Sequence, residues 1–424
     1  MDLPDAKRAK REPRLDAVAA MLKWLTAAGA TGLDTIKVHA TPDGGVGVAS
    51  GDAGVAPGEE IASIPATCVM SVGRSAASAV GVACNALPHD TLLPVPEYVL
   101  WLDMASGRRD ESHASHPYLA ALPKEAPDVA SWTTEELALL AGTDVGAAAM
   151  ASNEALAAEH ARVQALLGPA YEVPLAEMRW ARGCYLSRRF PPRLLDAKAP
   201  SMAVHKSNCR GASSTAFSPR KDLVYPTHWL IAHRSTGAPG ILLPFFDLLN
   251  HGKGTEIEWR GDGQSVAFAA GADGIEAQAE IFNNYGSKAN DELLLAHGFA
   301  LENNEHDRVA LKMTVASGDG RRTLGPFYLR RGGDFPRALW RALANPTGDP
   351  VSSDSDSPPE IDAEAVEVLL ATLERKLAPF TASKTADAEA ARGVVGRPAS
   401  VAFYRIGQRK ILEDAVEALR SMLG

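Results

Sequence analysis

The order of strand-like and helix-like segments is the feature that most limits the folds open to this chain. Short β-type runs occur in two groups, and a mostly helical stretch at 94–190 separates the groups. The first group lies at 35–39, 46–49 and 60–65, and the second lies at 256–259, 265–268 and 280–282. Because strands and helices do not alternate, the pattern argues against a doubly wound parallel sheet and favours an α+β fold.

The end of the chain has a different character from its middle. Helical patterns lie at 363–377 and 401–422, although Gly407 predicts an interruption of the second helix. Residues 346–360 are rich in Ser, Asp and Pro and have almost no apolar side chains, which is typical of a linker. The segment 200–240 has little periodicity and is interpreted as a long loop or insertion.

These patterns predict a domain organisation. A β-rich core domain is expected at 15–315, split by a helical insertion at about 75–240. An all-helical C-terminal domain is expected at 316–424, with the acidic linker at 346–360 inside it. Residues 1–14 are expected to form a disordered, basic tail.

The composition limits the classes of function. With 43 Lys and Arg against 52 Asp and Glu, the net charge of −9 disfavours a general nucleic-acid binder. The four cysteines show no C-x-x-C spacing, so neither a zinc cluster nor a disulfide framework is indicated, and a reduced, intracellular protein is expected. No apolar run approaches the roughly 20 residues of a membrane span, and no secretory signal is recognised. The basic run at 7–11 fits either nuclear import or a solvated tail, so the expected compartment is cytoplasmic or nuclear.

A glycine-rich run, Gly45-Val46-Gly47-Val48-Ala49-Ser50, lies in the second β-type segment. It differs from a Rossmann phosphate loop, because the third glycine is absent and another turn follows instead of a helix. A hairpin of small residues accounts for it equally well. Alternatively, the glycines let the backbone lie close to a cofactor that a Cβ would obstruct.

Two further segments carry polar residues in places where an apolar environment is expected. Asp247-Leu248-Leu249-Asn250-His251 follows the apolar run 241–246, and Asn284-Tyr285-Gly286-Ser287 precedes a helical pattern at 290–295. Each segment alone fits the capped end of a strand or helix. Together, polar groups that converge beside an apolar wall can bind an adenosyl group through hydrogen bonds.

A third segment, Ser187-Arg188, ends a helical pattern at 175–189. As an isolated pair it fits a cation that complements a helix dipole. A fixed guanidinium also suits the geometry of a ligand carboxylate.

The chain resembles SET-domain protein methyltransferases of the branch that contains the Rubisco large-subunit methyltransferase and the actin-histidine methyltransferase. The string at 280–299, which contains Tyr285-Gly286, carries the resemblance most specifically, together with Asn250-His251 and Ser187-Arg188. Segments at 115–123 and 404–412 are also similar to segments of this family. The resemblance covers most of the chain and implies a β-rich SET core split by a helical insertion.

The resemblance implies the cofactor S-adenosyl-L-methionine, no metal, and a protein substrate. The net charge and the lack of a long apolar run lead us to expect no nucleic acid and no membrane partner, and the oligomeric state stays open, with a monomer favoured. Tyr285 would be the catalytic residue and would line the methyl-transfer channel. The other residues expected to bind the cofactor are Gly45, Val46, Gly47, Arg188, Asp247, Asn250 and His251. The expected substrate pocket consists of Phe246, His297 and Phe299.

Two of these residues depart from the family pattern and leave the target side chain open. His297 stands where the family usually has a Tyr, and Phe246 occupies a place that is often small in the lysine enzymes and aromatic in the actin-histidine enzyme. We expect a protein-lysine N-methyltransferase. The alternatives are a protein-histidine N-methyltransferase and a non-catalytic SET-like binding module.

Overall fold

The computed structural model describes residues 12–42, 44–87, 96–196, 202–204, 239–317, 320–344, 361–393 and 396–424. They form two compact units, and each is described by itself. Unit 1 comprises Met1–Trp132 and Ala148–Ser287, and unit 2 comprises Thr133–Ala147 and Lys288–Gly424. In these ranges no helix is both long enough and apolar enough to cross a membrane.

Several predicted segments fall on the edges of the described ranges. The linker at 346–360 and nearly all of the loop at 200–240 lie outside them. Residues 1–11 of the predicted tail also lie outside, but helix α2 already begins at Glu12, so the last three residues assigned to the tail are helical. The predicted domain ranges remain predictions.

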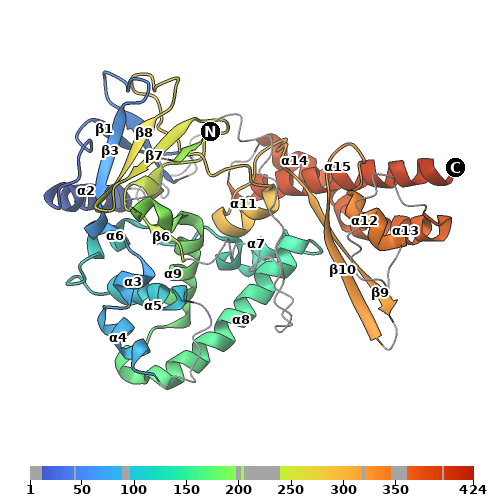
Figure 1. The fold of residues 1–424 in the computed structure, drawn as a ribbon, viewed down its shortest axis with the longest axis horizontal. Coiled ribbons are helices and arrows are strands. Elements are labelled where there is room, and N and C mark those ends of the chain that lie inside the picture. Colours follow the sequence, from blue (N-terminus) through green and yellow to red (C-terminus); the bar gives the residue numbers. More distant parts are fainter. Residues whose placement is uncertain are drawn as a thin grey trace. The chain divides into compact units, whose positions relative to one another are not determined.

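Unit 1 combines short antiparallel strands with helices, which confirms the predicted α+β class (Figure 1). Its strands are β1 (Ile36–Ala40), β2 (Val46–Ser50), β3 (Glu60–Pro65), β4 (Arg189–Phe190), β5 (Met202–Val204), β6 (Ile241–Leu242), β7 (Ile257–Gly261) and β8 (Ser265–Ala270). Its helices are α2 (Glu12–Ala27), α3 (Val72–Ser75), α4 (Ala79–Asn85), α5 (Glu97–Gly107), α6 (His116–Ala121), most of α8 (Asp144–Leu167) and α9 (Leu175–Arg188). Short 3₁₀ helices are η1 (Ala66–Cys68), η2 (Val129–Ser131), η3 (Pro169–Tyr171), η4 (Pro192–Leu195) and η6 (Phe246–Leu248).

The sheets of unit 1 join the two groups of β-type segments across the helical stretch. Strands β3, β8, β7 and β5 form one antiparallel sheet in this order, β1 pairs with β2, and β4 pairs with β6. Strand β8 lies alongside β3, although about two hundred residues separate them. The helical stretch is therefore an insertion between strands that pair, as predicted.

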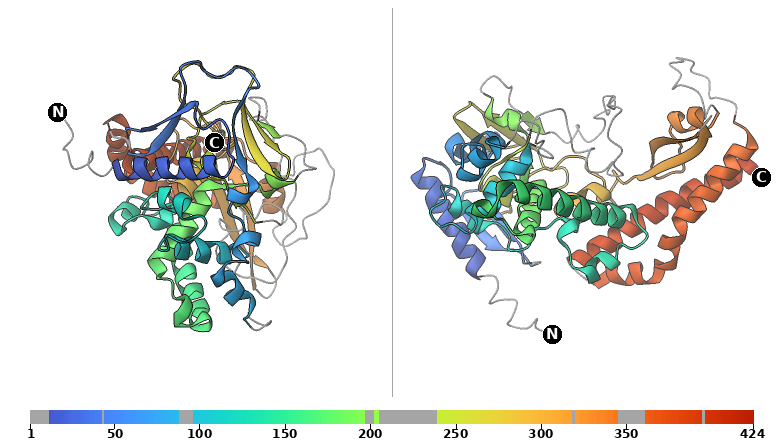
Figure 2. Two further views of the ribbon diagram at one scale, coloured as in Figure 1. Left: turned by 90° about the vertical axis from the view of Figure 1, so that its left-hand side faces the viewer. Right: turned by 90° about the horizontal axis from the view of Figure 1, so that it is seen from below.

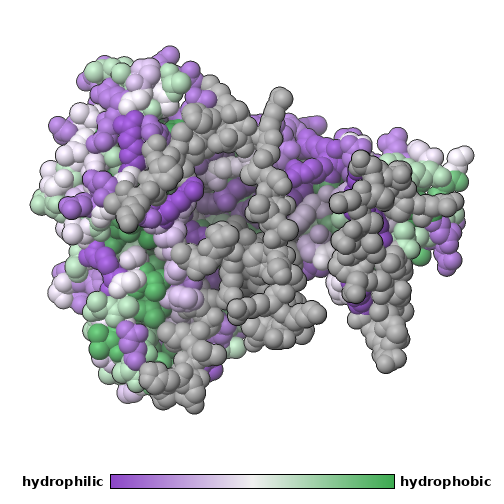
Figure 3. Space-filling model, in the orientation of Figure 1, coloured by the Kyte–Doolittle hydropathy of each residue, from purple (hydrophilic) through white to green (hydrophobic). Residues whose placement is uncertain are grey.

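One hydrophobic core holds unit 1 together. It contains the fully buried rings of Tyr98, Tyr185 and Phe268, among others. Helix α2 packs against α6 and against β1 (Figure 2). Apolar surface is visible over α4 and α5, where Val82 is 59% exposed (Figure 3).

The strand predicted at 280–282 is the one β-type prediction that was wrong. Its backbone bonds are divided between two neighbours: Ile281 N–H donates to the Val48 carbonyl, and Asn283 N–H donates to the Asn250 carbonyl. Only isolated bridges result, Ala49 to Glu280 and His251 to Asn283. The segment therefore passes from the edge of β2 to the segment that carries Asn250 and His251.

Unit 2 is mainly helical, and its C-terminal part confirms the predicted helical region. Its helices are α7 (Thr134–Ala138), α11 (Asn290–His297), α12 (Arg337–Ala344), α13 (Ala363–Ala382), α14 (Lys384–Gly393) and α15 (Arg397–Leu423). Helices α13 and α14 pack against α15 (Figure 2). A hairpin of β9 (Val309–Ser317) and β10 (Gly320–Leu329), which the sequence analysis did not predict, shares the core of this unit.

Helix α15 runs unbroken through Gly407, where an interruption was predicted. A Cβ at this position would lie 2.2 Å from Asp307 Oδ2, so the glycine lets a buried carboxylate approach the helix backbone. Asp307 in turn accepts from the backbone and side-chain amides of Asn290 at 2.9 and 3.1 Å. Gly407 therefore serves the packing of α11 against α15 and does not end the helix.

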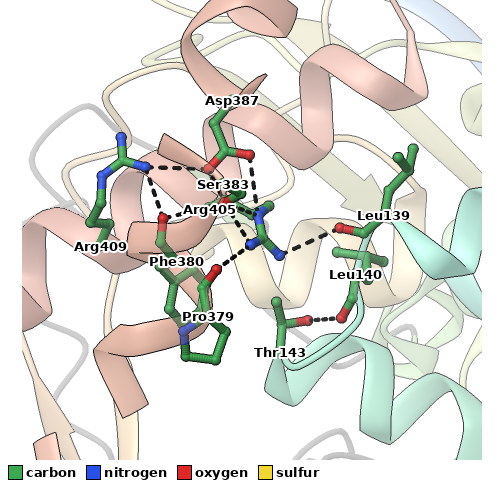
Figure 4. Close-up of polar contacts among 9 residues, drawn as sticks. All are labelled: Leu139, Leu140, Thr143, Pro379, Phe380, Ser383, Asp387, Arg405 and Arg409. Atoms are coloured by element: carbon green, nitrogen blue, oxygen red, sulfur yellow. Dashed lines mark hydrogen bonds and ion pairs between the residues drawn. The ribbon is translucent and has the colours of Figure 1, made fainter. Parts of the chain in front are cut away.

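A polar cluster surrounds the middle of α15 (Figure 4). Asp387 accepts from Arg405 and from Arg409, both at 3.2 Å. Arg405 also donates to the carbonyls of Pro379 and Leu139, and Arg409 donates to a carbonyl at the end of α13. The two arginines therefore satisfy carbonyls that the end of a helix leaves without intrahelical partners.

Candidate active site

Strand β6 brings two of the predicted site residues together. β6 pairs with β4, and Arg188 is the last residue of α9, directly before β4. After β6 the chain turns at Phe245, whose φ of 74° lies in the left-handed region that residues with a Cβ rarely adopt. The buried Phe245 ring fixes this turn, and η6 then presents Asp247 to Arg188.

Arg188 and Asp247 form a buried ion pair. Arg188 Nη1 lies 3.4 Å from Asp247 Oδ2, and Arg188 also donates to the Asp247 carbonyl. The Tyr118 hydroxyl donates to Asp247 Oδ2 at 2.8 Å. Burial raises the pKa of Tyr118 well above its ordinary value, so this hydroxyl remains a donor. Burial also raises the pKa of Asp247, an effect that the Arg188 charge opposes.

Two polar atoms of this cluster are buried without a hydrogen-bond partner in the described part of the chain. They are Asp247 Oδ1, an acceptor, and Arg188 Nε, a donor. Each buried polar atom without a partner lowers the stability of the fold by about 1–3 kcal/mol, and by more when the group is charged. The Asp247 side chain is 0% exposed and the Arg188 side chain is 13% exposed, so the guanidinium is the part of this pair that a ligand could contact.

Asn250 is held against β2. Its Nδ2 donates to Glu280 Oε1 at 2.8 Å and to the Val46 carbonyl at 3.3 Å. At the next residue of β2, a Cβ on Gly47 would lie 2.7 Å from His39 Nε2 and 3.1 Å from Glu280 Oε1. The place that a Cβ of Gly47 would take therefore lies against two side chains of the protein, and the cofactor-binding role expected for Gly47 remains a prediction.

His251 and Tyr285 stack on each other. Their ring centroids are 5.1 Å apart, with 22° between the ring planes. The Tyr285 backbone N–H donates to His251 Nδ1 at 3.2 Å, and the Tyr285 hydroxyl donates to the Leu249 carbonyl at 2.9 Å. Burial raises the pKa of Tyr285 to about 12, with opposing contributions from Arg188 and Asp247. The hydroxyl therefore stays protonated at neutral pH.

The structure thus gathers the predicted cofactor residues in unit 1 around the crossing of the 247–251 and 283–285 segments. The predicted substrate-pocket residues are distributed differently. Phe246 is fully buried, with its ring 5.2 Å from Trp259 and 5.9 Å from Phe268, so it packs in the core. His297 ends α11 and lies 6.0 Å from Phe299, and both belong to unit 2. Their role in a pocket remains a prediction.

Three residues that take part in this arrangement were not singled out from the sequence as site residues. Tyr118 and Glu280 lie in segments that carried the family resemblance, and His39 lies in the first β-type run. The sequence signals that could have identified two of them were the hydroxyl of Tyr118 and the carboxylate of Glu280, because each lies in a segment that is otherwise expected to be apolar. In the described ranges, no group of three or more His, Cys, Asp or Glu side chains has an arrangement that could hold a metal ion.

The comparison with protein-family models gives no match. Among curated proteins, the chain is similar to ribosomal lysine N-methyltransferase set10 of Schizosaccharomyces pombe, with 36% identity over 109 residues, 24% of this chain and 18% of that protein. It is also similar to protein-lysine N-methyltransferase EFM1 of Saccharomyces cerevisiae, with 27% identity over 266 residues, 54% of this chain and 43% of that protein. The chain spans less than half the length of these curated relatives.

Among solved structures, the chain is similar to Rubisco LSMT bound to AdoMet, with a TM-score of 0.71 and 18% identity over 96% of this chain and 92% of that chain. It is also similar to the SET domain of LSMT bound to lysine and AdoHcy, with a TM-score of 0.72 and 17% identity over 96% of this chain and 91% of that chain. The chain therefore has the SET-domain fold. The predicted resemblance to SET-domain methyltransferases is confirmed in sequence and in structure.

Proposed function

We propose that this chain, with its SET-domain fold, is an S-adenosylmethionine-dependent protein-lysine N-methyltransferase. The observation that carries the proposal is the crossing of two motif segments. The Asn283 N–H donates to the Asn250 carbonyl, and His251 stacks on Tyr285. The curated relatives with similar sequences bear the names of lysine methyltransferases, which supports lysine over histidine as the target.

The residues present fit the proposed cofactor. The amino-acid end of S-adenosylmethionine carries a carboxylate and an ammonium group. The Arg188 side chain is 13% exposed and can donate to the carboxylate, whereas Asp247, whose side chain is 0% exposed, would hold the guanidinium in place. Asn250, His251 and the backbone of residues 45–47 would complete the binding site. When bound, the cofactor supplies a methyl group on a positively charged sulfur.

Tyr285 is assigned to positioning. Its hydrogen is committed to the Leu249 carbonyl, so its oxygen remains an acceptor for an N–H of the substrate amine. Its pKa of about 12 makes it a poor base near neutral pH. A lysine must nevertheless lose its proton before it attacks. For a free lysine this costs about 4.6 kcal/mol at pH 7, and burial beside a positive charge can lower the lysine pKa by about 3–5 units.

The other parts of the proposal concern the substrate and the location. The predicted C-terminal domain at 316–424 would recognise the protein substrate, and His297 and Phe299 of unit 2 would contribute to the target pocket. Buried free cysteines, Cys68, Cys84 and Cys184, support a reducing location inside the cell. The cytoplasm and the nucleus both satisfy this condition.

The direct test is to incubate the protein with methyl-labelled cofactor and a cell extract and to map the labelled side chain by mass spectrometry. Methyl-lysine is expected, with a rate that rises steeply through the alkaline range because the neutral amine limits it. Methyl-histidine, with a rise near pH 6–7, would replace the lysine assignment. If the protein neither binds the cofactor nor transfers the label, it is a binding module.

Tyr285→Phe separates turnover from binding. The variant keeps the ring over His251 and removes the hydroxyl, so kcat is expected to fall at least about tenfold while cofactor affinity changes little. Tyr98→Phe is the matched control, because it removes another buried hydroxyl of unit 1, which bonds His160 at 3.1 Å. A near-normal kcat of Tyr285→Phe on the identified substrate contradicts the assigned role.

A further inference from the structure

The Asn250 amide is held in one orientation. Its two contacts, Glu280 Oε1 and the Val46 carbonyl oxygen, are both acceptors, so only the amide nitrogen can face them. Asn250 Oδ1 makes no hydrogen bond to the described residues, and it is not one of the fully enclosed polar atoms. The amide therefore offers an acceptor, and not a donor, to a ligand.

Glu280 is well placed to impose this orientation. Its backbone is fixed by the bridge to Ala49 and by the Ile281 N–H, which donates to the Val48 carbonyl at 2.7 Å. Its carboxylate reaches Asn250 across the face of Gly47, where a Cβ would lie 3.1 Å from Oε1. An ionised carboxylate has no hydrogen to donate, so it cannot bond the oxygen end of the amide.

We propose that Glu280 is a positioning residue that keeps Asn250 Oδ1 directed toward the ligand and thereby makes the site selective for a ligand with an ammonium group. This inference rests on the proposed cofactor site. Without Glu280, the amide can turn and present its nitrogen, which repels an ammonium group.

Two variants of equal length isolate the acceptor. Glu280→Gln keeps a carbonyl oxygen that can bond Asn250 Nδ2, whereas Glu280→Met has no acceptor at that place. The probes are S-adenosylhomocysteine, which carries the ammonium group, and 5′-methylthioadenosine, which lacks the whole amino-acid end, its ammonium group and its carboxylate included. Affinities are measured by calorimetric titration, and thermal unfolding checks that each variant is folded.

Glu280→Met is expected to bind S-adenosylhomocysteine about tenfold more weakly, while its affinity for 5′-methylthioadenosine stays within about twofold. Glu280→Gln is expected to retain both affinities within about twofold. A merely structural role predicts equal losses for both ligands, and that result would overturn the inference. Unchanged affinity of Glu280→Met for S-adenosylhomocysteine would also overturn the inference.

The double-mutant cycle with Asn250→Ala keeps the inference testable if Glu280→Met is unstable. In the Asn250→Ala background, Glu280→Gln and Glu280→Met should bind S-adenosylhomocysteine equally, because the residue through which Glu280 acts is gone. A persistent difference between them contradicts the inference. Failure of the unmodified protein to bind S-adenosylhomocysteine would instead contradict the proposed function.

Discussion

Two clusters in this protein join a buried aspartate to arginine, and they differ in how completely the protein uses their polar atoms. In unit 2, Asp387 accepts from Arg405 and Arg409, whose other donors bind backbone carbonyls (Figure 4). In unit 1, Asp247 pairs with Arg188, but Asp247 Oδ1 and Arg188 Nε have no partner among the described residues. Both clusters consist of aspartate and arginine, but only the cluster in unit 1 contains buried polar atoms that have no hydrogen-bond partner among the described residues.

This difference distinguishes a structural cluster from the proposed ligand site. A buried polar atom without a partner lowers stability, so the Arg188–Asp247 cluster contributes less to the fold than the cluster in unit 2. The cluster around Asp387 closes the end of α13 and ties it to α14 and α15, and it needs nothing further. The two clusters therefore differ in hydrogen-bond satisfaction, and not in the presence of an ion pair.

The largest effect is expected from Arg405→Met in unit 2. The change deprives Asp387 of one arginine and strands the carbonyls of Pro379 and Leu139. The free energy of unfolding should fall by about 3–5 kcal/mol, as measured by urea denaturation. The control is Arg420→Met, whose ion pair with Glu374 is exposed and should be worth less than about 1 kcal/mol. Equal effects of the two changes would remove the distinction between buried and exposed pairs.

Asp247→Asn is expected to affect ligand affinity more than the free energy of unfolding. Affinity for S-adenosylhomocysteine should fall about a hundredfold, because the buried carboxylate that holds the Arg188 guanidinium in place is lost. The free energy of unfolding should fall by about 1–3 kcal/mol, less than for Arg405→Met, since asparagine keeps an oxygen beside the buried Arg188 but not the charge. Asp103→Asn is the matched control, because that buried carboxylate bonds Ser75 and faces His113. A large loss of stability with unchanged affinity would make the Asp247 cluster structural as well.

The sequence predicted the α+β class and the insertion well, because both depend on the local periodicity of long segments. The prediction of a strand at 280–282 was wrong because its backbone pairs with two different neighbours, which periodicity does not reveal. The hairpin at 309–329 was missed, although alternating apolar residues on both sides of Gly-Asp-Gly at 318–320 are typical of one.

The candidate site was predicted largely through motifs, and its supporting residues were not. Tyr118 reaches Asp247 across 129 positions, and Glu280 reaches Asn250 across 30 positions. Such contacts follow from the fold, so a single sequence gives them no local signal. Gly407 illustrates the same limit: the sequence suggests an interrupted helix, whereas a carboxylate from a distant segment requires the glycine.

A third buried carboxylate, Asp291 on α11, refines the comparison, because its arginine is present but distant. Arg308 Nε lies 3.8 Å from Asp291 Oδ2, and burial raises the Asp291 pKa to about 7. Because this pKa is higher in the folded state than in the unfolded chain, the protonated form stabilises the fold. That contribution is fully present below about pH 4 and is lost as the pH rises through 7.

Asp291→Asn should therefore weaken the pH dependence of the unfolding free energy. Between pH 5 and 8, the unmodified protein should lose about 2 kcal/mol more than the variant, as measured by denaturation at each pH. Asparagine keeps an oxygen that can accept from the Glu292 N–H. Asp262→Asn is the control, because the pKa of this exposed group is lowered by bonds from Ser265 and Gln264, and the change should leave this pH range unaffected. Parallel profiles for Asp291→Asn and the unmodified protein would contradict the expectation.

The smallest effect is expected from Gly47→Ala. This change tests the part of the candidate site around Asn250, where the amide nitrogen has hydrogen-bond partners. The new Cβ would displace the ends of two flexible side chains, His39 and Glu280, so the free energy of unfolding should change by less than about 1 kcal/mol. Moving Glu280 weakens its hold on Asn250, and the affinity for S-adenosylhomocysteine should fall about threefold in calorimetric titration. Gly73→Ala in α3 is the control, because only Ser71 lies near the added Cβ, at 4.0 Å, and alanine favours a helix. If Gly47→Ala binds as tightly as this control, the protein side chains that fill the space beside Gly47 do not orient Asn250. Arg188, held in place by Asp247, would then account for ligand selection without help from β2.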